Sequence, residues 1–327
     1  MKRLLIILMC VMAALPMSGR KKVALVLGGG GAKGAAEVGV LKYIERSGVP
    51  IDMVVGTSIG SVVGGLYCMG YSADEMDRLF RSQEWIDLFT DGVSVESLLN
   101  EVAESPKSAL QKITGLLDFK SMLKDYGIVK GDSIVGFLNK MVSARGECMQ
   151  SSFDSLRVPF RAVAVDLKAM DEVVIRQGDL PMTMRASMAI PLVFRPVQKD
   201  GMLLADGGVL NNLPVDVARN MGADIVIAVD LTQNKHDDSQ AGSELLNKSY
   251  VTKLLERVPW VNWLLKRPDR EKYNQNVKDA DVYINPRLDD CSVTSFAKVD
   301  YMIGQGEKAG KAALKKLKKV KKKAKKG

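Results

Sequence analysis

Ser58 is the residue of this 327-residue chain whose surroundings best suit it to covalent chemistry, because it lies in Gly56-Thr57-Ser58-Ile59-Gly60. Glycines two residues on either side of a serine permit the sharp strand-to-helix turn that exposes a nucleophilic hydroxyl. A serine hydroxyl needs a base to take its proton, and the usual base is imidazole. The single histidine, His236, lies in a polar stretch that predicts a loop. Either the glycine spacing is incidental, or the base is not a histidine.

The segment Gly28–Gly34 is the second candidate, with five glycines in seven positions. It matches G-x-G-x-x-G, but the acidic residue that a dinucleotide site places about 20 residues further on is missing. A P-loop is also excluded, because Lys33-Gly34 has the order of its lysine and glycine reversed. Backbone N–H groups without side-chain cover at a helix start can stabilise an oxyanion. The alternative is a plain strand–helix turn, which needs one or two glycines.

Asp206, in Asp206-Gly207-Gly208, is the third candidate and follows an apolar run. A carboxylate in such a turn commonly bonds to its own backbone. The other interpretation is that Asp206 is the base for Ser58, since partial burial raises the basicity of a carboxylate.

The elements that would position these residues are apolar strands that lead into glycine turns and helices. Residues 23–27 and 53–55 are such strands, and each is followed by a helical pattern, which predicts an α/β fold with a parallel sheet. Residues 71–155 predict mainly helices. We expect further strands at 160–165, 172–175, 203–205 and 225–229, and helices at 59–69, 185–191, 215–221 and after about 290.

The charge is concentrated at one end of the chain. The net charge is +9, but residues 311–327 hold ten lysines and no acid, so the rest of the chain is close to neutral. This excludes a basic nucleic-acid-binding domain. The apolar residues Ala313, Leu314, Leu317 and Val320 recur at helical spacing, so the segment is either a solvated tail or a short basic amphipathic helix attracted to anionic headgroups.

Residues 1–19 predict a signal peptide, with Lys2 and Arg3 before an apolar run of twelve residues, Leu4–Leu15. The run is short for a membrane span, which needs about 20 residues. Three widely spaced cysteines remain after its removal, which indicates neither a disulfide framework nor a metal site: Cys68, Cys148 and Cys291. Trp260 and Trp263 belong to a further apolar cluster, either core or lipid-facing.

Together the three candidate segments resemble the motifs of the patatin-like phospholipase family, in family order. Ala186–Pro191 and Asn211-Asn212-Leu213-Pro214 also fit the family pattern, and the resemblance covers about residues 22–232. It implies a three-layer α/β/α fold with a mostly parallel central sheet and a helical insertion. The expected organisation is a signal peptide at 1–19, a catalytic domain at 20–232, a mainly helical extension at 233–310 and a lysine-rich tail at 311–327.

The family uses a Ser–Asp dyad without histidine, which accounts for the single His236. By this resemblance Ser58 is the nucleophile and Asp206 the general base, and the N–H groups of Gly29, Gly30 and Gly31 form the oxyanion hole. Gly34, Gly56, Gly60, Gly207 and Gly208 complete the motifs, and Lys33 steadies the loop or a phosphate. The implied reaction is ester hydrolysis through an acyl-serine, without cofactor or metal.

The resemblance implies a lipid or phospholipid substrate and, with the signal peptide, a periplasmic or secreted enzyme. An anionic membrane surface is a second expected partner, through residues 311–327, whereas nucleic acid is not expected. The alternative function is that of a catalytically silent relative that binds lipid or is tethered to a membrane.

Overall fold

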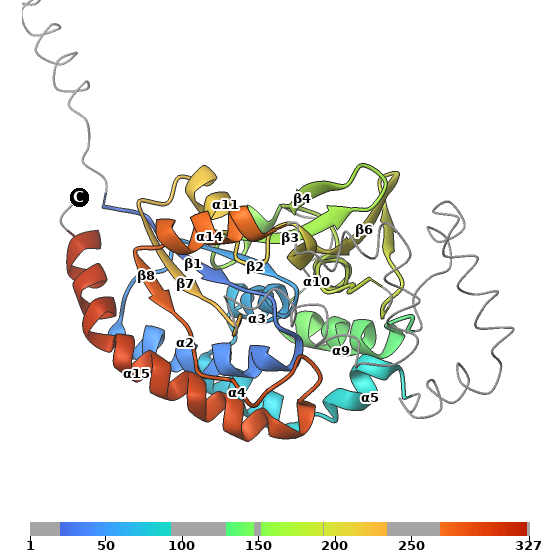
Figure 1. The fold of residues 1–327 in the computed structure, drawn as a ribbon, viewed down its shortest axis with the longest axis horizontal. Coiled ribbons are helices and arrows are strands. Elements are labelled where there is room, and N and C mark those ends of the chain that lie inside the picture. Colours follow the sequence, from blue (N-terminus) through green and yellow to red (C-terminus); the bar gives the residue numbers. More distant parts are fainter. Residues whose placement is uncertain (1–19, 93–128, 147–151, 192, 234–268, 326–327) are drawn as a thin grey trace, which may run out of the picture.

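An eight-stranded sheet forms the centre of the computed structural model, which describes residues 20–92, 129–146, 152–191, 193–233 and 269–325 (Figure 1). The strands are β1 (Val23–Leu27), β2 (Met53–Thr57), β3 (Phe160–Asp166), β4 (Asp171–Ile175), β5 (Val197–Lys199), β6 (Met202–Asp206), β7 (Ile225–Val229) and β8 (Val282–Ile284). Their order is β5-β6-β3-β2-β1-β7-β8, with β4 also paired to β3.

The half of the sheet from β3 to β8 is parallel, and the remaining pairs are antiparallel. The pairs β2–β3, β1–β2, β1–β7 and β7–β8 run parallel, whereas β4 and β6 run antiparallel to β3, and β5 antiparallel to β6. The predicted α/β class with a mostly parallel sheet is confirmed.

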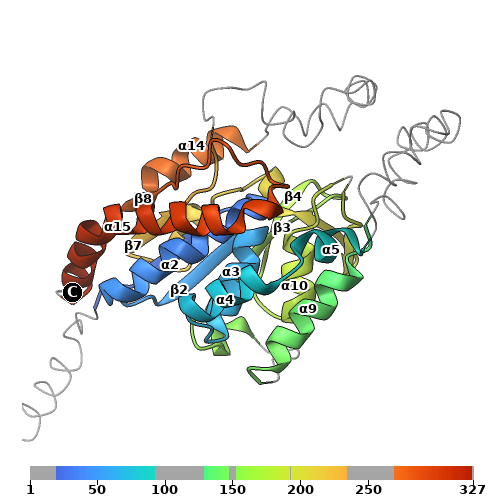
Figure 2. The same cartoon turned by 90° about the horizontal axis from the view of Figure 1, so that it is seen from below.

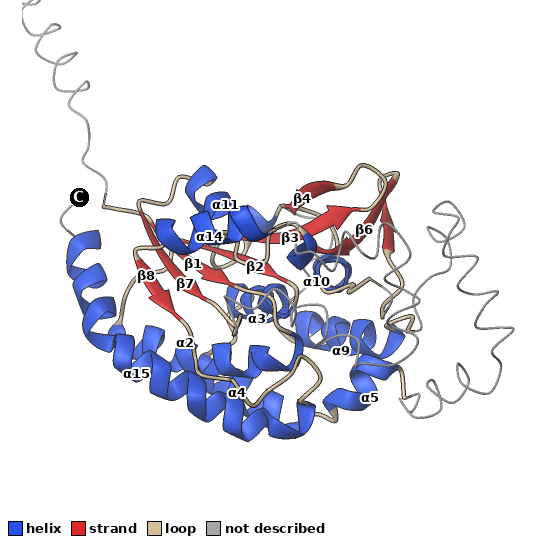
Figure 3. Cartoon of the chain, in the orientation of Figure 1, coloured by secondary structure: helices blue, strands red, loops and turns tan. Residues whose placement is uncertain are grey.

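Helices cover both faces of this sheet (Figure 3). Strand β1 illustrates this cover on both faces, because all five of its residues are fully buried. Val23, Leu25 and Leu27 belong to one hydrophobic cluster, which includes residues of α2 (Ala35–Ser47), α3 (Ile59–Cys68) and α10 (Leu180–Ser187). Ala24 and Val26 belong to the opposite cluster, with residues of α11 (Val215–Asn220) and α14 (Arg270–Asp279). Side chains of a strand alternate between faces, so the fold has three layers.

The described part of the predicted helical insertion is indeed mainly helical. It contains α4 (Ala73–Ser82), α5 (Trp85–Thr90) and α9 (Asp132–Ser143). Residues 93–128 and 147–151 lie outside the described residues.

The prediction of a short helix at 185–191 was misplaced. Helix α10 ends at Ser187, well before Pro191, and begins at Leu180 behind the N-cap Asp179, whose side chain accepts the Met182 N–H at 2.8 Å. The sequence pattern that marks this start is an N-cap aspartate followed by a proline in the first turn.

Helix α15 (Val299–Ala324) combines the end of the predicted extension with most of the predicted tail. It lies along α2 (Figure 2). Ala313, Leu317 and Val320 are buried, so the apolar stripe of the lysine-rich segment faces the body of the protein and not a lipid phase. In the described part of the chain, no helix is both long enough and apolar enough to cross a membrane.

Candidate active site

Ser58 lies at the turn between β2 and α3 in a strained backbone conformation. Its φ of 55° and ψ of −127° place it where residues other than glycine are uncommon, as in a nucleophile elbow. The turn is tight enough to require its flanking glycines. A Cβ at Gly56 would lie 2.3 Å from the Gly60 carbonyl oxygen, and a Cβ at Gly60 would lie 2.4 Å from that of Leu27. The sequence motif therefore forms the predicted elbow.

The pairing of β3 brings Asp206 to this elbow. Along one edge of β3, the parallel strand β2 ends with Thr57 opposite Val163, and the antiparallel strand β6 ends with Asp206 opposite Ala164. Strand β4 occupies the other edge of the same stretch. Because β2 and β6 run toward each other along one edge, their last residues meet, and Ser58 follows directly after Thr57.

The Asp206 carboxylate lies near enough to the Ser58 hydroxyl for that hydroxyl to favour its ionised form. It also accepts a hydrogen bond from the Gly208 N–H at 2.7 Å, and the residue is only 6% exposed. Burial raises the pKa of Asp206 to about 6, because desolvation of the charged form outweighs the opposing effects of the Ser58 hydroxyl and the Gly208 N–H. At neutral pH the group is therefore an ionised carboxylate of raised basicity in contact with a serine hydroxyl.

The glycine-rich loop between β1 and α2 lies beside this pair. A Cβ on Gly29 would be 3.2 Å from the Ser58 Cβ, so the loop backbone lies against the serine side chain. The Gly29 N–H, however, donates to the Asn212 carbonyl at 3.1 Å. Among the described residues, the N–H groups of Gly30 and Gly31 have no hydrogen-bond acceptor. Of the three predicted oxyanion donors, Gly30 and Gly31 therefore have N–H groups that no described residue already accepts.

The other motif glycines allow close packing around Ser58 and Asp206. A Cβ would clash with the Ile59 side chain at Gly34, with the Val163 carbonyl at Gly207 and with the Asn212 amide oxygen at Gly208. Lys33 is buried in the short helix η1 (Gly31–Gly34) and lies near the thiol of Cys291, where its charge opposes the burial that raises the pKa of that thiol.

Residues Asn211 and Asn212, which fit the family pattern but had no predicted role, connect the three segments. The Asn212 Nδ2 donates to the Gly29 carbonyl at 3.3 Å, and the Thr57 hydroxyl donates to the Asn211 carbonyl at 2.9 Å. The loop after β6 thus holds both the glycine-rich loop and the end of β2.

The sequence prediction also gave no role to Ser187, the last residue of α10. Its Oγ accepts the Ser58 N–H at 3.0 Å and donates to the Val163 carbonyl at 2.6 Å. Two residues on, the Ala189 carbonyl accepts the Asp206 N–H at 2.9 Å. Ser187 and the turn after α10 therefore hold the backbone of both Ser58 and Asp206. In the sequence, the only indication of this role was the position of Ser187 within the small-residue motif Ala186–Pro191.

The segment between β8 and α15 supports the glycine-rich loop from the other side. The Val293 carbonyl accepts the Ala32 N–H at 2.8 Å, and a Cβ at Gly31 would lie 2.5 Å from the same oxygen. The chain after residue 232 is thus in direct contact with the site.

Some predicted features fall outside the described residues: 1–19, Cys148, His236, Trp260 and Trp263. The part of the chain that the structure describes contains no histidine, and within it no three His, Cys, Asp or Glu side chains are grouped to hold a metal ion. Cys68 is buried and free, as expected for a core residue.

Comparison with known proteins identifies the same region. The family model described as "Patatin-like phospholipase" matches residues 25–219. Human patatin-like phospholipase domain-containing protein 6 is 33% identical over 309 residues, which cover 89% of this chain and 20% of that protein. An uncharacterised NTE family protein of Mycobacterium bovis is 34% identical over 250 residues, covering 76% of this chain and 57% of the relative. The chain thus spans about a fifth of the length of the larger relatives.

Among solved structures, VipD from Legionella pneumophila aligns with a TM-score of 0.47 and 18% identity. The alignment covers 91% of this chain and 67% of VipD.

Proposed function

The chain belongs to the patatin-like phospholipase family, and we propose that it hydrolyses carboxylic ester bonds of phospholipids or related lipids. Ser58 is the nucleophile and Asp206 the general base of a two-residue dyad. The observation that carries this proposal is that β2 and β6 end at adjacent residues of β3, Val163 and Ala164, which brings the Ser58 hydroxyl beside the buried Asp206 carboxylate.

In the proposed reaction, the Ser58 Oγ attacks the ester carbonyl carbon while Asp206 accepts the hydroxyl proton. The tetrahedral intermediate collapses to an acyl-serine, and the proton on Asp206 passes to the leaving alcohol. A water molecule then attacks the acyl-serine while Asp206 takes its proton, and that proton passes to the Ser58 Oγ as the bond to the acyl group breaks and the fatty acid leaves. The strained φ of Ser58 places its side chain at the sharp turn between strand and helix, as a nucleophile elbow requires.

The N–H groups of Gly30 and Gly31 stabilise the oxyanion of the tetrahedral intermediate. Each lacks a protein acceptor among the described residues, whereas the Gly29 N–H already donates to Asn212. Gly29 contributes space, because any side chain there would meet Asn212 and Ser58. Ser58 also occupies the N-cap of α3, where the positive end of the helix dipole favours developing negative charge.

Hydrolysis of a chromogenic acyl ester by the purified protein tests the proposal. Ser58→Ala and Asp206→Asn should each remove almost all activity, since either change disables the dyad. His236→Ala should leave the rate unchanged. Equal slow hydrolysis by the wild type and Ser58→Ala would favour the alternative function, a catalytically silent lipid-binding relative. A large loss in His236→Ala would contradict the histidine-free mechanism.

Two further expectations remain part of this proposal. Residues 1–19 direct export to the periplasm or medium, which amino-terminal sequencing of the exported protein would test. The lysine-rich segment attracts the protein to an anionic membrane surface. Since the apolar stripe of α15 is buried, this attraction depends on charge and not on insertion.

A further inference from the structure

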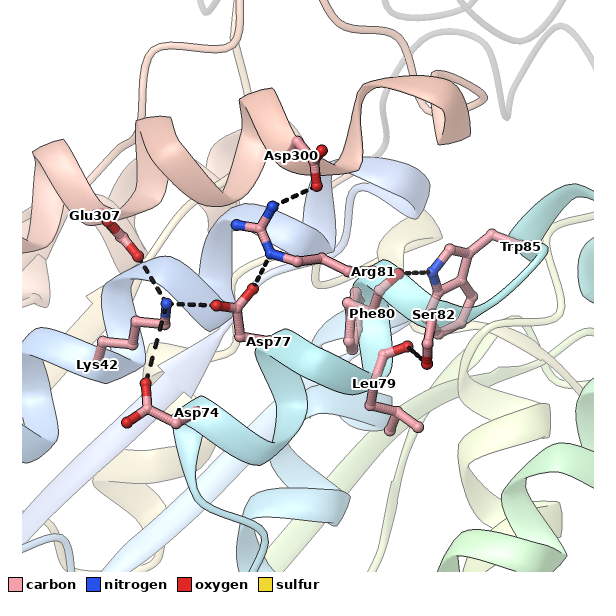
Figure 4. A network of polar contacts seen from close by, with 10 residues as sticks. All are labelled: Lys42, Asp74, Asp77, Leu79, Phe80, Arg81, Ser82, Trp85, Asp300 and Glu307. Atoms are coloured by element: carbon pink, nitrogen blue, oxygen red, sulfur yellow. Dashed lines mark hydrogen bonds and ion pairs between the residues drawn. The ribbon is translucent and has the colours of Figure 1, made fainter.

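The acidic residues and most of the lysines lie in different parts of α15. Its acidic residues Asp300 and Glu307 lie in the first part of the helix and are paired with cations of neighbouring helices (Figure 4). Glu307 accepts a hydrogen bond from Lys42 of α2 at 2.7 Å, and Asp300 pairs with Arg81 of α4. Lys42 is also 2.6 Å from Asp77, which in turn bonds to Arg81. This network neutralises the end of α15 that lies near the site.

Beyond Glu307 the helix and its C-cap, Lys325, carry ten lysines and no acid. Nine of these lysines are exposed, and Lys321 is half-buried. Within the described residues, none of the ten forms an ion pair. A row of like charges on one helix is unfavourable for the isolated protein, because the neighbours repel one another. Such a surface is typical of a site for a polyanionic partner.

The chemistry of this surface favours a lipid bilayer over a nucleic acid. The segment from Lys308 to Gly327 contains no arginine and no aromatic residue. Arginine forks recognise individual phosphates bidentately, and aromatic side chains stack on the bases of single strands. A run of lysines on a straight helix instead suits the diffuse negative potential of an anionic membrane.

The lysine surface lies at the opposite end of the molecule from the dyad. Helix α15 starts beside the loop that contacts Ala32 and ends beside Gly48, where the Lys321 Nζ would lie 2.6 Å from an added Cβ. Twenty residues of α-helix span roughly 30 Å. Figures 1 and 2 both place the end of α15 next to the start of β1, where Lys21 and Lys22 are exposed. The dyad lies at the other, carboxyl ends of the parallel strands β1 and β2.

We propose that the exposed lysines of α15, with Lys21 and Lys22, form an electrostatic docking surface for an anionic lipid bilayer that holds the dyad at the end of the molecule away from that bilayer. The docking surface deepens the membrane attraction proposed above by naming its residues and orientation, and it does not depend on hydrolase activity. The stated orientation rests on the proposed site. Substrate then reaches Ser58 from the side that does not face the docking membrane.

Docking is tested by flotation of the Ser58→Ala protein with vesicles, so that catalysis plays no part. The protein should bind phosphatidylserine-containing vesicles, bind pure phosphatidylcholine vesicles weakly, and dissociate at high salt. Lys315→Gln, Lys319→Gln and Lys322→Gln combined should lower the partition coefficient roughly 100-fold, since each lysine near an anionic surface contributes about fivefold. A matched control changes three exposed lysines elsewhere: Lys130→Gln, Lys140→Gln and Lys278→Gln.

An equal loss in the control triple variant, equal binding to both vesicle types, or tighter binding to duplex DNA than to anionic vesicles would overturn the docking surface. Orientation is tested with active protein, a water-soluble ester and anionic vesicles of ether-linked lipids, which cannot be hydrolysed. Saturating vesicles should leave kcat/KM unchanged, and strong inhibition by them would overturn the orientation. Absence of turnover without vesicles would instead refute the proposed function and leave the binding result intact.

Discussion

Ser187 holds the backbone of Ser58 and leaves its side chain free: the Ser187 Oγ accepts the Ser58 N–H at 3.0 Å. The same oxygen donates its proton to the Val163 carbonyl at 2.6 Å. Val163 is also the residue of β3 that pairs with Thr57. The strained elbow is therefore fixed to the sheet at the point where β2 and β6 meet, and the Ser58 hydroxyl remains free to bond with Asp206.

Ser187→Ala should lower activity through position and not through loss of a reacting group. The change leaves the Ser58 N–H and the Val163 carbonyl without their buried partner, which costs about 1–3 kcal/mol of unfolding free energy. A relaxed elbow misplaces the nucleophile, so we expect a roughly 10- to 100-fold lower kcat with a smaller change in KM. Steady-state kinetics and urea unfolding measure the two effects.

Thr183, one turn earlier on α10, provides the matched control. It is also buried, but its hydroxyl has no hydrogen-bond partner in the structure. Thr183→Val should therefore leave kcat unchanged and leave stability unchanged or improved. If the two variants lose similar activity, the role assigned to Ser187 is wrong.

The pH dependence of activity should follow Asp206. Its carboxyl has a pKa of about 6 because it is buried, and only the ionised form can accept the Ser58 proton. We expect kcat/KM for a chromogenic ester to fall tenfold for each pH unit well below this value, and to level off above it. A profile that stays flat from neutral pH to two units below pH 6 would show that another group is the base.

Asp206→Asn should abolish activity and also stabilise the fold above pH 6. The ordinary pKa of 3.8 rises to about 6 in the folded protein, so the native state binds the proton more tightly than the unfolded chain does. Stability contributed by this group is thus present at low pH and lost as the pH rises from 3.8 to about 6. Asparagine carries no charge to desolvate, so the gain should reach on the order of 2–3 kcal/mol at neutral pH.

Urea unfolding of Asp206→Asn and the wild type across this pH range measures the difference. The gain should disappear as the pH falls below 3.8, where Asp206 is protonated in both the folded and the unfolded wild type. If the variant is less stable than the wild type at neutral pH, burial of the Asp206 charge does not destabilise the fold as proposed.

Local patterns were sufficient to predict the elements that carry Ser58 and Asp206. Strands β1 and β2 are continuous apolar runs that end in glycine turns, and these signals require no distant partner. The meeting of β2 and β6 on one edge of β3 was not predictable in this way, because pairing register depends on the whole sheet. The three-residue strands β5 and β8 were also missed, since they are too short to show a period.

The lysine-rich end of the chain could be a solvated tail or a short basic amphipathic helix by its sequence, and the structure shows a helix. The packing of this helix was not predicted: the small and apolar residues between the lysines continue a stripe that begins earlier, at Met302 and Ile303. That stripe packs on α2, and the surface of α2 at this contact includes Gly39, where an added Cβ would lie 2.2 Å from the Ile303 carbonyl oxygen. A helix-to-helix contact of this kind depends on two segments more than 250 residues apart, so neither segment reveals it alone.

The close approach of α15 and α2 depends on Gly306, and its replacement should destabilise the protein. A Cβ at Gly306 would lie 1.9 Å from the Ala36 carbonyl oxygen in the first turn of α2, so Gly306→Ala must push the helices apart. We expect a loss of about 2–3 kcal/mol, in the range of overpacked cores. Activity should fall as well, because Ala36 directly follows the glycine-rich loop at Gly31–Gly34.

Gly304, on the same helix, separates this steric effect from helix propensity. A Cβ there would meet nothing within 4 Å. Gly304→Ala should stabilise the protein by roughly 0.5–1 kcal/mol, because alanine favours a helix interior. Urea unfolding of both variants, with the ester assay alongside, measures the contrast. Equal stability of the two variants would show that α15 does not pack on α2 through Gly306.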